Sequence, residues 1–214
     1  MGPGHDSAHA SVHSGDGRLG CRLHLDRTGP RPGPGPVNGR VYLRPPRADD
    51  REEFLTRVRQ SRALHRPWNY PPKDDGAFAA YLERCRTSVD ASLVCRREDD
   101  AIAGVMNVNN IVLLGFRSAA LGYYGFAPFG GQGYMAEGLD LVLRRAFGEL
   151  GLHRLEANIQ PGNTRSIALV KAAGFRLEGY SPRFLKIGGR WRDHERWAIL
   201  AEHLGNSRGP GRRT

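Results

Sequence analysis

The sequence has 214 residues, of which 39% are hydrophobic and 25% charged, and its formal net charge is +10. This length and apolar content predict one folded domain with a sizeable core. The sequence contains no continuous apolar segment that would suit a signal peptide or a membrane span. Its three cysteines and eight histidines lack metal-ligand spacing, so we expect no metal site and a cytoplasmic protein with reduced thiols.

The composition divides the chain into three parts. Residues 1–38 are rich in Gly, Pro, Ser and His without apolar periodicity, which predicts a disordered N-terminal segment. Residues 39–204 carry the pattern of a folded domain, and residues 205–214 predict a disordered basic tail. Residues 1–40 hold five Arg against three Asp and the tail holds three Arg, so about +5 of net charge remains on the domain.

The front half of the domain reads as short strands and two helices. In chain order we expect a strand at residues 41–44, a helix after residue 50, a helix after residue 75, and strands at 91–96 and 101–108. Both helices begin after a pair of aspartates, and we expect these carboxylates to cap the helix starts. The order predicts a hairpin-rich, antiparallel first half.

The most informative segment is Leu-Gly-Tyr-Tyr-Gly-Phe-Ala-Pro-Phe-Gly-Gly-Gln-Gly at residues 121–133. Its first six residues are aromatic and extended in character, Pro128 ends them, and three glycines follow. Such glycines let main-chain N–H groups converge on a small anion. The next helix, residues 134–150, has one apolar face and directs its N-terminus at the loop, where its dipole favours a phosphate. A flexible strand-to-helix turn has the same pattern, so the loop alone is weak evidence.

The back half continues with alternating elements. In chain order we expect a strand at residues 154–159, the loop Gln160-Pro161-Gly162-Asn163, a helix at 164–173, and a closing hairpin of strands 184–187 and 190–200 around Gly188-Gly189. A strand, a glycine loop, a helix, a strand and an Asn-capped helix form a compact α/β unit.

With these segments in place, residues 39–202 resemble the GNAT acetyltransferases. Ser-Arg-Ala-Leu-His-Arg-Pro-Trp at 61–68, Glu-Ala-Asn-Ile-Gln-Pro-Gly-Asn-Thr-Arg-Ser at 156–166 and Gly-Arg-Trp-Arg-Asp-His at 189–194 are similar to the RimJ-type branch. That branch acetylates the N-terminal alanine of ribosomal proteins. The resemblance implies an α+β fold in which a mixed, mostly antiparallel sheet of about seven strands is flanked by helices.

The resemblance also implies a reaction, in which acetyl passes from acetyl-coenzyme A to an amine. The acceptor we expect is the N-terminal α-amine of a ribosomal or other protein. An α-amine has a pKa of about 7.7 to 8.0, so part of it is neutral at cellular pH and no strong base is needed. Two alternatives stay open: a small amine as acceptor, such as an aminoglycoside, polyamine or amino acid, or a non-catalytic module that binds coenzyme A or the ribosome. The basic surface suits ribosome association, a solvated surface explains it equally well, and we expect a monomer or homodimer with no membrane contact.

We expect the cofactor to be held chiefly by main-chain groups around the glycine loop. The cofactor-binding residues that we expect are Phe126, Ala127, Phe129, Gly130, Gly131, Gln132, Gly133, Tyr134 and Asn163. The resemblance points to the N–H groups around Phe126 and Ala127, at a splayed strand end, as donors to the oxyanion. Pro128 stands where the superfamily usually has Arg or Gln, which main-chain donors tolerate.

The proton donor to the departing thiolate is harder to assign. Val170 stands where many relatives carry a tyrosine acid, so Ser166, one helical turn after Asn163, is the catalytic candidate. Its alternative role is a backbone contact at the helix start. Candidates for a base or a substrate anchor are His65, His194, Asp193 and Glu156, and none of them is singled out by spacing.

Overall fold

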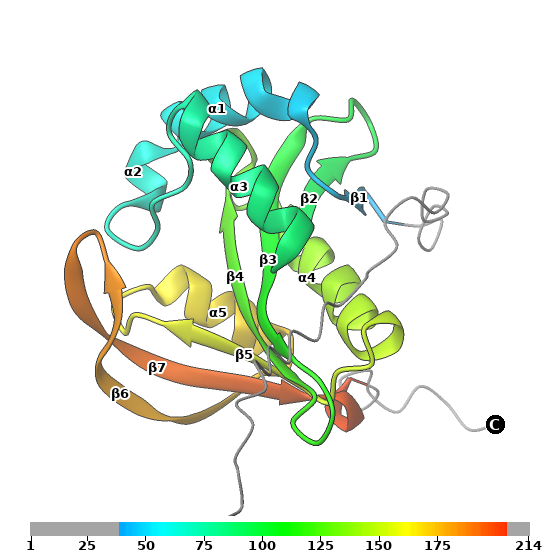
Figure 1. The fold of residues 1–214 in the computed structure, drawn as a ribbon, viewed down its shortest axis with the longest axis vertical. Helices are drawn as coiled ribbons and strands as arrows, with labels where there is room; N and C mark the ends of the chain where they lie inside the picture. The colour runs from blue at the N-terminus through cyan, green and yellow to red at the C-terminus, as the bar shows by residue number, and fades with distance from the viewer. Residues whose placement is uncertain (1–38, 205–214) are drawn as a thin grey trace, which may run out of the picture. The chain divides into compact units, whose positions relative to one another are not determined.

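A seven-stranded sheet with helices on both faces forms the described part of the chain (Figure 1). The structure is a computed structural model that describes residues 39–204. The two segments predicted to be disordered, 1–38 and 205–214, lie outside the described residues. The described residues all belong to one compact unit.

The element boundaries follow the expected order. The strands are β1 (Val41–Arg44), β2 (Asp90–Arg96), β3 (Ile102–Val112), β4 (Ser118–Gly125), β5 (Arg154–Ile159), β6 (Arg176–Ile187) and β7 (Arg190–Leu200). The helices are α1 (Arg51–Gln60), α2 (Arg62–His65), α3 (Asp75–Thr87), α4 (Tyr134–Arg144) and α5 (Thr164–Ala172), with a π turn at Arg145–Glu149 and 3-10 turns at Ala48–Asp50, Ala127–Phe129 and Ala201–His203.

The strand order is β1-β2-β3-β4-β5-β7-β6, and every pair is antiparallel except β4 with β5. The expected mixed, mostly antiparallel sheet of seven strands is therefore confirmed. The parallel pair is short, because it covers only Ser118–Ala120 of β4 against 154–156 of β5. Beyond this point the two strands separate, as Figure 1 shows, and the second half of β4 loses its neighbour on that side.

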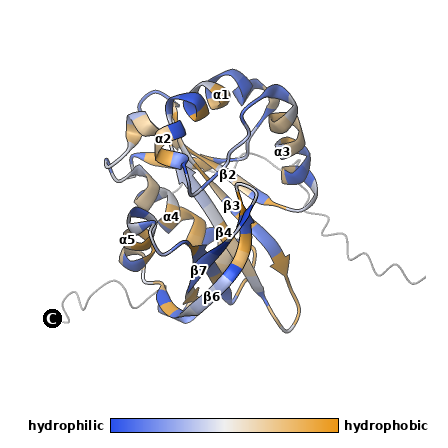
Figure 2. Ribbon diagram, turned by 90° about the vertical axis from the view of Figure 1, so that its left-hand side faces the viewer, coloured by the Kyte–Doolittle hydropathy of each residue, from blue (hydrophilic) through white to orange (hydrophobic). Residues whose placement is uncertain are grey.

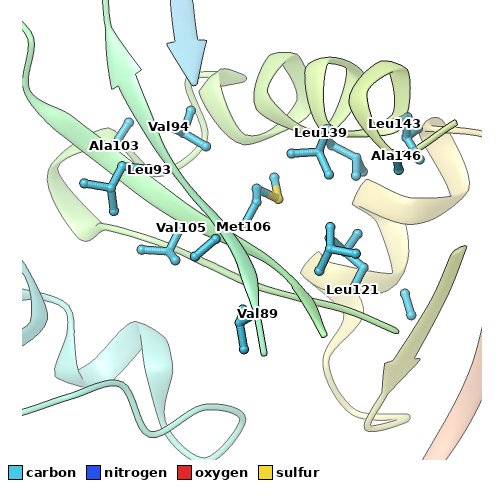
Figure 3. Close-up of a cluster of buried hydrophobic side chains, with 14 of the residues drawn as sticks. Val89, Leu93, Val94, Ala103, Val105, Met106, Leu121, Leu139, Leu143 and Ala146 are labelled. Atoms are coloured by element: carbon cyan, nitrogen blue, oxygen red, sulfur yellow. The ribbon is translucent and has the colours of Figure 1, made fainter. Parts of the chain in front are cut away.

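Helix α4 covers one face of the sheet with an apolar stripe. Figure 3 shows Leu139 and Leu143 of this helix and Ala146 of the π turn that follows it beside side chains of the sheet, among them Met106 and Leu121, and all five are buried. Because this stripe recurs at the helical spacing, the sequence predicted the helix correctly. The helix ends at Arg144 and continues as the π turn, which together match the predicted span of 134–150.

The opposite face is covered by α1 and α3 through an aromatic cluster. The ring of Phe54 lies 4.9 Å from Phe78, 5.9 Å from Tyr81 and 5.8 Å from Phe126, centroid to centroid. Such pairs contribute roughly 0.5–1.5 kcal/mol each beyond the area they bury. Phe126 is the residue that follows β4, so this cluster fixes the point at which the strand leaves the sheet.

The two expected aspartate caps have different outcomes. Asp74 caps α3 as predicted, because its Oδ1 accepts from the Ala77 N–H at 2.9 Å. Asp50 does not cap α1. Its carboxylate instead accepts from Arg44 at 2.6 and 2.8 Å and from the Arg47 N–H at 2.6 Å, which ties the 3-10 turn to β1. A buried bidentate arginine contact outcompetes a helix N–H for this carboxylate.

Candidate active site

The second half of β4 presents main-chain groups to the space that β5 has left. The Phe126 N–H donates to the Ala103 carbonyl at 2.9 Å, which places even-numbered residues in register to bond β3. The N–H and C=O groups of Tyr123 and Gly125 therefore point away from β3, toward the gap between β4 and β5. The N–H groups of Tyr123 and Gly125 are therefore the main-chain groups of β4 that can donate to a ligand in the gap.

The two N–H groups expected to serve as oxyanion donors already have acceptors within the protein. The sequence pointed to the N–H groups of Phe126 and Ala127, but the protein uses both internally. Phe126 bonds Ala103, and the Ala127 N–H donates to the hydroxyl of the fully buried Ser61 at 2.8 Å. That expectation is wrong, because strand alternation and a buried serine occupy both groups. The donors that face the gap belong to Tyr123 and Gly125.

The glycine loop begins with a tight turn. In the turn Ala127–Phe129, the Phe129 N–H bonds the Phe126 carbonyl at 3.0 Å and the Gly130 N–H bonds the Ala127 carbonyl at 3.1 Å. The Gly130 N–H is therefore used within the turn and not at an anion. The next N–H groups, at residues 131–135, have no acceptor in the part of the chain that the structure describes.

Those N–H groups lie at the start of α4, where the helix dipole adds positive potential. Gly131 and Gly133 have φ of 75° and 86°, which a residue with a side chain rarely adopts, so glycine is needed for this path. The Gly133 carbonyl accepts from Ala136 and Glu137 and so begins the helix. A run of unpaired N–H groups at a helix start suits a pyrophosphate.

Arg40, which the sequence analysis did not single out, fixes this loop from outside. Its Nη2 donates to the Gln132 carbonyl at 2.9 Å, and its Nε and main-chain N–H donate to the Glu137 carboxylate at 2.7 and 2.8 Å. The guanidinium also lies over the Tyr134 ring at 4.8 Å. Gln132 turns its own side chain back to the Pro128 carbonyl at 3.0 Å. These contacts hold the path of the loop.

The two aromatic residues of the loop are core residues. Phe129 and Tyr134 are buried and contact each other edge to face at 6.2 Å. Arg57 and Arg96 stack over the Phe129 ring at 4.9 and 5.2 Å, and each also pairs with a carboxylate. Both aromatic side chains therefore anchor the loop. Of their two N–H groups, that of Tyr134 remains for a cofactor, because the Phe129 N–H bonds the Phe126 carbonyl.

The start of α5 lies close to the end of β4. The Asn163 side chain caps the helix by accepting from the Ser166 N–H at 3.3 Å, and the Tyr123 hydroxyl donates to the Ser166 carbonyl at 3.1 Å. This contact brings the half-buried Ser166 to the gap. Val170 is fully buried in the core. Tyr123 was missed as a hydroxyl near the site, although it stands in the diagnostic strand, and burial raises its pKa to about 12.

Of the four candidates for base or anchor, the structure brings His65 to the end of β4. Its Nε2 lies 2.8 Å from the Gly125 carbonyl oxygen, which can only accept, so Nε2 carries the proton. Nδ1 is then the lone-pair nitrogen, and no group of residues 39–204 bonds it. Burial lowers the pKa of His65, which favours the neutral ring.

The other three candidates have different contacts. Glu156 accepts from Arg154 at 2.8 Å, and Asp193 accepts from the Arg183 N–H at 2.7 Å and from Tyr180. His194 is buried and bonds the Arg192 carbonyl at 3.0 Å. Asp193 and His194 alternate on β7 as the sequence predicted, so they form no pair.

The segment between α2 and α3, residues 66–74, is here called the front loop. Asn69 donates to the Tyr123 carbonyl at 3.2 Å, which places the loop at the gap. A methyl group built on Gly162 would lie 3.0 Å from Trp68, and one on Gly188 only 2.3 Å from the Tyr70 hydroxyl. The front loop therefore contacts both the β5–α5 loop and the β6–β7 turn.

A cavity of about 900 Å³ adjoins this site, between α1, α2, the front loop and α3. We call it the basic cavity. It is lined by Val58, Arg59, Arg62, His65, Arg66, Asn69, Tyr70, Pro71, Pro72, Lys73, Ala77, Ala80 and Arg84. The lining contains four arginines and a lysine but no carboxylate, and His65 belongs both to it and to the end of β4.

Residues 39–204 contain neither a cluster of metal ligands nor a helix that could cross a membrane. No three of the His, Cys, Asp and Glu side chains gather as a group that would hold a metal ion. No helix in this range has the length and apolar character needed to cross a membrane.

Comparison with known proteins identifies relatives along most of the domain. A family model described as Acetyltransferase (GNAT) domain matches residues 40–176. A probable N-acetyltransferase of Bacillus subtilis, YjcK, is 31% identical over 169 residues, which are 75% of this chain and 93% of the relative. The ribosomal protein uS5-alanine N-acetyltransferase of Escherichia coli is 38% identical over 97 residues, which are 45% of this chain and only 50% of that relative.

Solved structures show the same fold. Mycobacterium smegmatis RimJ in complex with CoA-disulfide superimposes with a TM-score of 0.70 at 28% identity, covering 77% of this chain and 83% of that one. The spermidine/spermine N-acetyltransferase of Vibrio cholerae has a TM-score of 0.63 at 19% identity, covering 79% and 98%. The second likeness is one of fold alone.

Proposed function

Because this chain belongs to the GNAT acetyltransferase family, we propose that it transfers an acetyl group from acetyl-coenzyme A to the N-terminal α-amine of a protein. A ribosomal protein is the acceptor that its relatives suggest, since the Escherichia coli relative is named as a ribosomal protein uS5-alanine N-acetyltransferase. We place the reaction in the cytoplasm, in keeping with Cys85 and Cys95, two buried cysteines that form no disulfide within residues 39–204.

The residues present fit acetyl-coenzyme A. The unpaired N–H groups of residues 131–135 at the start of α4 would take the pyrophosphate, with Arg40 holding the loop in shape. Asn163, at the start of α5, and the main chain of Phe126, Ala127, Phe129 and Gly130 would line the path of the pantetheine arm. The bound thioester supplies the acetyl group, and the protein supplies its position.

The protein groups at the gap match the needs of acyl transfer. The N–H groups of Tyr123 and Gly125 point to where an oxyanion would form, and such preorganised donors stabilise developing charge. The neutral His65 offers a lone pair at Nδ1 to receive the proton of an amine, directly or through water. Ser166 lies across the gap from His65, beside Tyr123. Its hydroxyl would donate a proton to the departing coenzyme A thiolate.

The observation that carries the choice of acceptor is the charge of the basic cavity. Five cationic side chains and no carboxylate line it. A polyamine is itself a polycation, and like charges brought together cost binding free energy. The cavity therefore disfavours spermidine-like substrates, even though a spermidine acetyltransferase shares the fold. The neutral backbone and single amine of a polypeptide N-terminus meet no such penalty.

A second candidate is a module that binds coenzyme A without turnover. The observation that favours it is Val170, which is buried in the core at the position where many relatives carry a tyrosine acid. Tyr123 is a weak substitute, because an acid with a pKa of about 12 is far from the ideal near neutral pH. Such a protein would bind coenzyme A and release no thiol.

Thiol release from acetyl-coenzyme A tests both candidates. The panel contains peptides that begin with Ala or Ser, the same peptides with acetylated N-termini, and small amines that include spermidine. Release with free peptide N-termini alone is the proposed result. Release with spermidine but with no peptide would overturn the proposal, and binding without any release would favour the module.

A further inference from the structure

The basic cavity carries charge that residues 39–204 leave without a counter-ion. Of its five cations, Arg59, Arg62, Arg66, Lys73 and Arg84, none has a carboxylate within ion-pair distance anywhere in residues 39–204. All five are exposed. Like charges held together at one cavity repel each other, so an anionic ligand would be attracted there.

Neighbouring arginines on the same helices are paired. On α1, Arg51 bonds Asp75 at 2.8 Å and Arg57 bonds Glu53 at 3.2 Å. On α3, Arg86 bonds Glu83 at 3.1 Å. Figure 2 shows hydrophilic residues along α1 and α3 at this end of the sheet. The lack of carboxylates in the cavity is therefore a local feature, because acidic residues are present on both helices.

The cavity shares two residues of its wall with the site at which acetyl would be delivered. His65 lines the cavity and bonds the Gly125 carbonyl at the end of β4, and Asn69 lines it and bonds Tyr123. A chain whose N-terminal amine lies at the gap would pass these residues and enter the cavity. The cations then lie along the residues that follow the acetylated one.

The walls favour a polypeptide over a nucleic acid. Val58, Pro71, Pro72, Ala77 and Ala80 supply apolar surface between the charges, which suits side-chain methylenes. Tyr70 is the one aromatic residue of the lining, whereas proteins that bind single strands stack successive bases on several aromatic rings. The cavity is a pocket between three elements, and duplex backbones are bound by extended surfaces.

We propose that the basic cavity binds acidic side chains of the acceptor polypeptide, a short distance after its N-terminal residue. This inference rests on the proposed function and specifies its substrate: free N-termini followed by Asp or Glu. Electrostatic complementarity of this kind sets specificity and the rate of encounter more than the chemical step. The charge preference should therefore act on KM and binding and leave kcat unchanged.

Direct binding tests the inference without turnover. The ligands are fluorescent peptides with acetylated N-termini that carry two Glu, two Gln or two Lys after the first residues. We expect the Glu peptide to bind about fivefold more tightly than the Gln peptide, since exposed charge pairs contribute up to about 1 kcal/mol. The Lys peptide should bind most weakly, and added salt should remove the difference.

Charge substitutions locate the effect. Arg62→Gln with Lys73→Gln should abolish the preference for Glu, whereas Arg176→Gln, an exposed cation at the start of β6, should leave it intact. Equal binding of the three peptides to the wild-type protein overturns the inference, and that outcome does not depend on the folding of any variant. An oligouridylate that binds through Arg62 and Lys73 while the peptides show no preference also overturns it.

The steady-state assay separates this inference from the proposed function. If free Ala peptides are acetylated with the same KM whatever the following charge, the proposed function stands and the inference fails. If the blocked Glu peptide binds selectively but no free peptide is acetylated, the cavity is an acidic-peptide site and the proposed transferase activity fails.

Discussion

The imidazole Nε2 of His65 bonds the main-chain oxygen of Gly125 at 2.8 Å, across 60 positions of the sequence. The contact ties α2 to the end of β4 at the point where β5 has separated. It also fixes the tautomer, because a carbonyl oxygen leaves Nε2 as the donor and Nδ1 as the acceptor. This hydrogen bond thus holds the proposed base in a fixed position relative to the strand that would bind the thioester.

We expect His65→Gln to lower kcat by about a hundredfold, within the range for loss of a general base, with little change in the KM for acetyl-coenzyme A. Glutamine can keep the bond to Gly125 but has no titratable lone pair. Steady-state kinetics with an Ala peptide measures the effect. The matched control is His153→Gln, an exposed histidine that pairs with Glu202. Wild-type kcat in His65→Gln would remove the base from the mechanism.

The pH dependence of the wild type follows from the same residue. Burial lowers the pKa of His65 below its ordinary value of about 6.5, so the ring is already neutral at pH 7. The same shift opposes folding at low pH, because the unfolded chain binds the proton more tightly. We expect the contribution of His65 to stability to be constant above pH 7 and to fall as the pH decreases below about 6.5, whereas the ring in the folded protein becomes charged only at a still lower pH. Denaturant unfolding at pH 7.5 and 5.5 checks this, and His65→Gln should reduce the difference.

Ser166→Ala tests the donor to the sulfur. The main-chain N–H of residue 166 keeps its bond to Asn163, so the helix cap survives the change. We expect kcat to fall by about tenfold, less than the hundredfold or more that a positioned general acid contributes, because a serine acts through water. Thr164→Ala on the same exposed helix start is the control. If Ser166→Ala retains full kcat, Ser166 is a structural residue, and Tyr123→Phe becomes the variant to measure.

Arg40→Ala tests how the glycine loop is held. The change removes the side-chain bonds to Gln132 and Glu137, so the loop can leave the conformation that presents its N–H groups. We expect the KM for acetyl-coenzyme A to rise by about threefold to tenfold, as for one or two lost hydrogen bonds, with kcat unchanged. Arg51→Ala, which breaks an exposed pair with Asp75, should have no effect on this KM.

A glycine pair in the β6–β7 turn tests the front loop. Both Gly188 and Gly189 have positive φ, of 58° and 81°, so alanine strains the backbone at either position. Only at Gly188 would the new methyl group meet Tyr70, because nothing lies within 4 Å of the one at Gly189. We expect Gly188→Ala to displace the front loop and raise the KM for the peptide. Equal effects of the two variants would contradict a role for this contact.

Much of the fold was predictable because its core elements repeat apolar residues at a regular period. β1 and β5 have the predicted bounds, and the α4 stripe that packs on Met106 and Leu121 was visible in the sequence. β6 was predicted only from residue 184, although it begins at Arg176. It is an edge strand exposed along most of its length, so it lacks the alternation that identifies a half-buried strand.

Site residues could be predicted where a local sequence pattern marks them. They could not be predicted where their role depends on contacts between segments that are distant in the sequence. The glycine loop and Asn163 lie at local strand and helix ends, which sequence patterns mark. The use of the Ala127 N–H by Ser61, and the choice of His65 over three other candidates, depend on residues about 60 positions away. The basic cavity likewise gathers α1, α2 and α3 around one space.

The most direct test of the central claim is the position of the acetyl group on a peptide that offers two amines. A peptide that begins with Ala and carries one internal Lys is incubated with the protein and acetyl-coenzyme A, and the product is mapped by tandem mass spectrometry. The account predicts acetylation of the α-amine alone, at a rate about a hundredfold lower in the His65→Gln variant. Acetyl on the lysine side chain, with the N-terminus free, would contradict it.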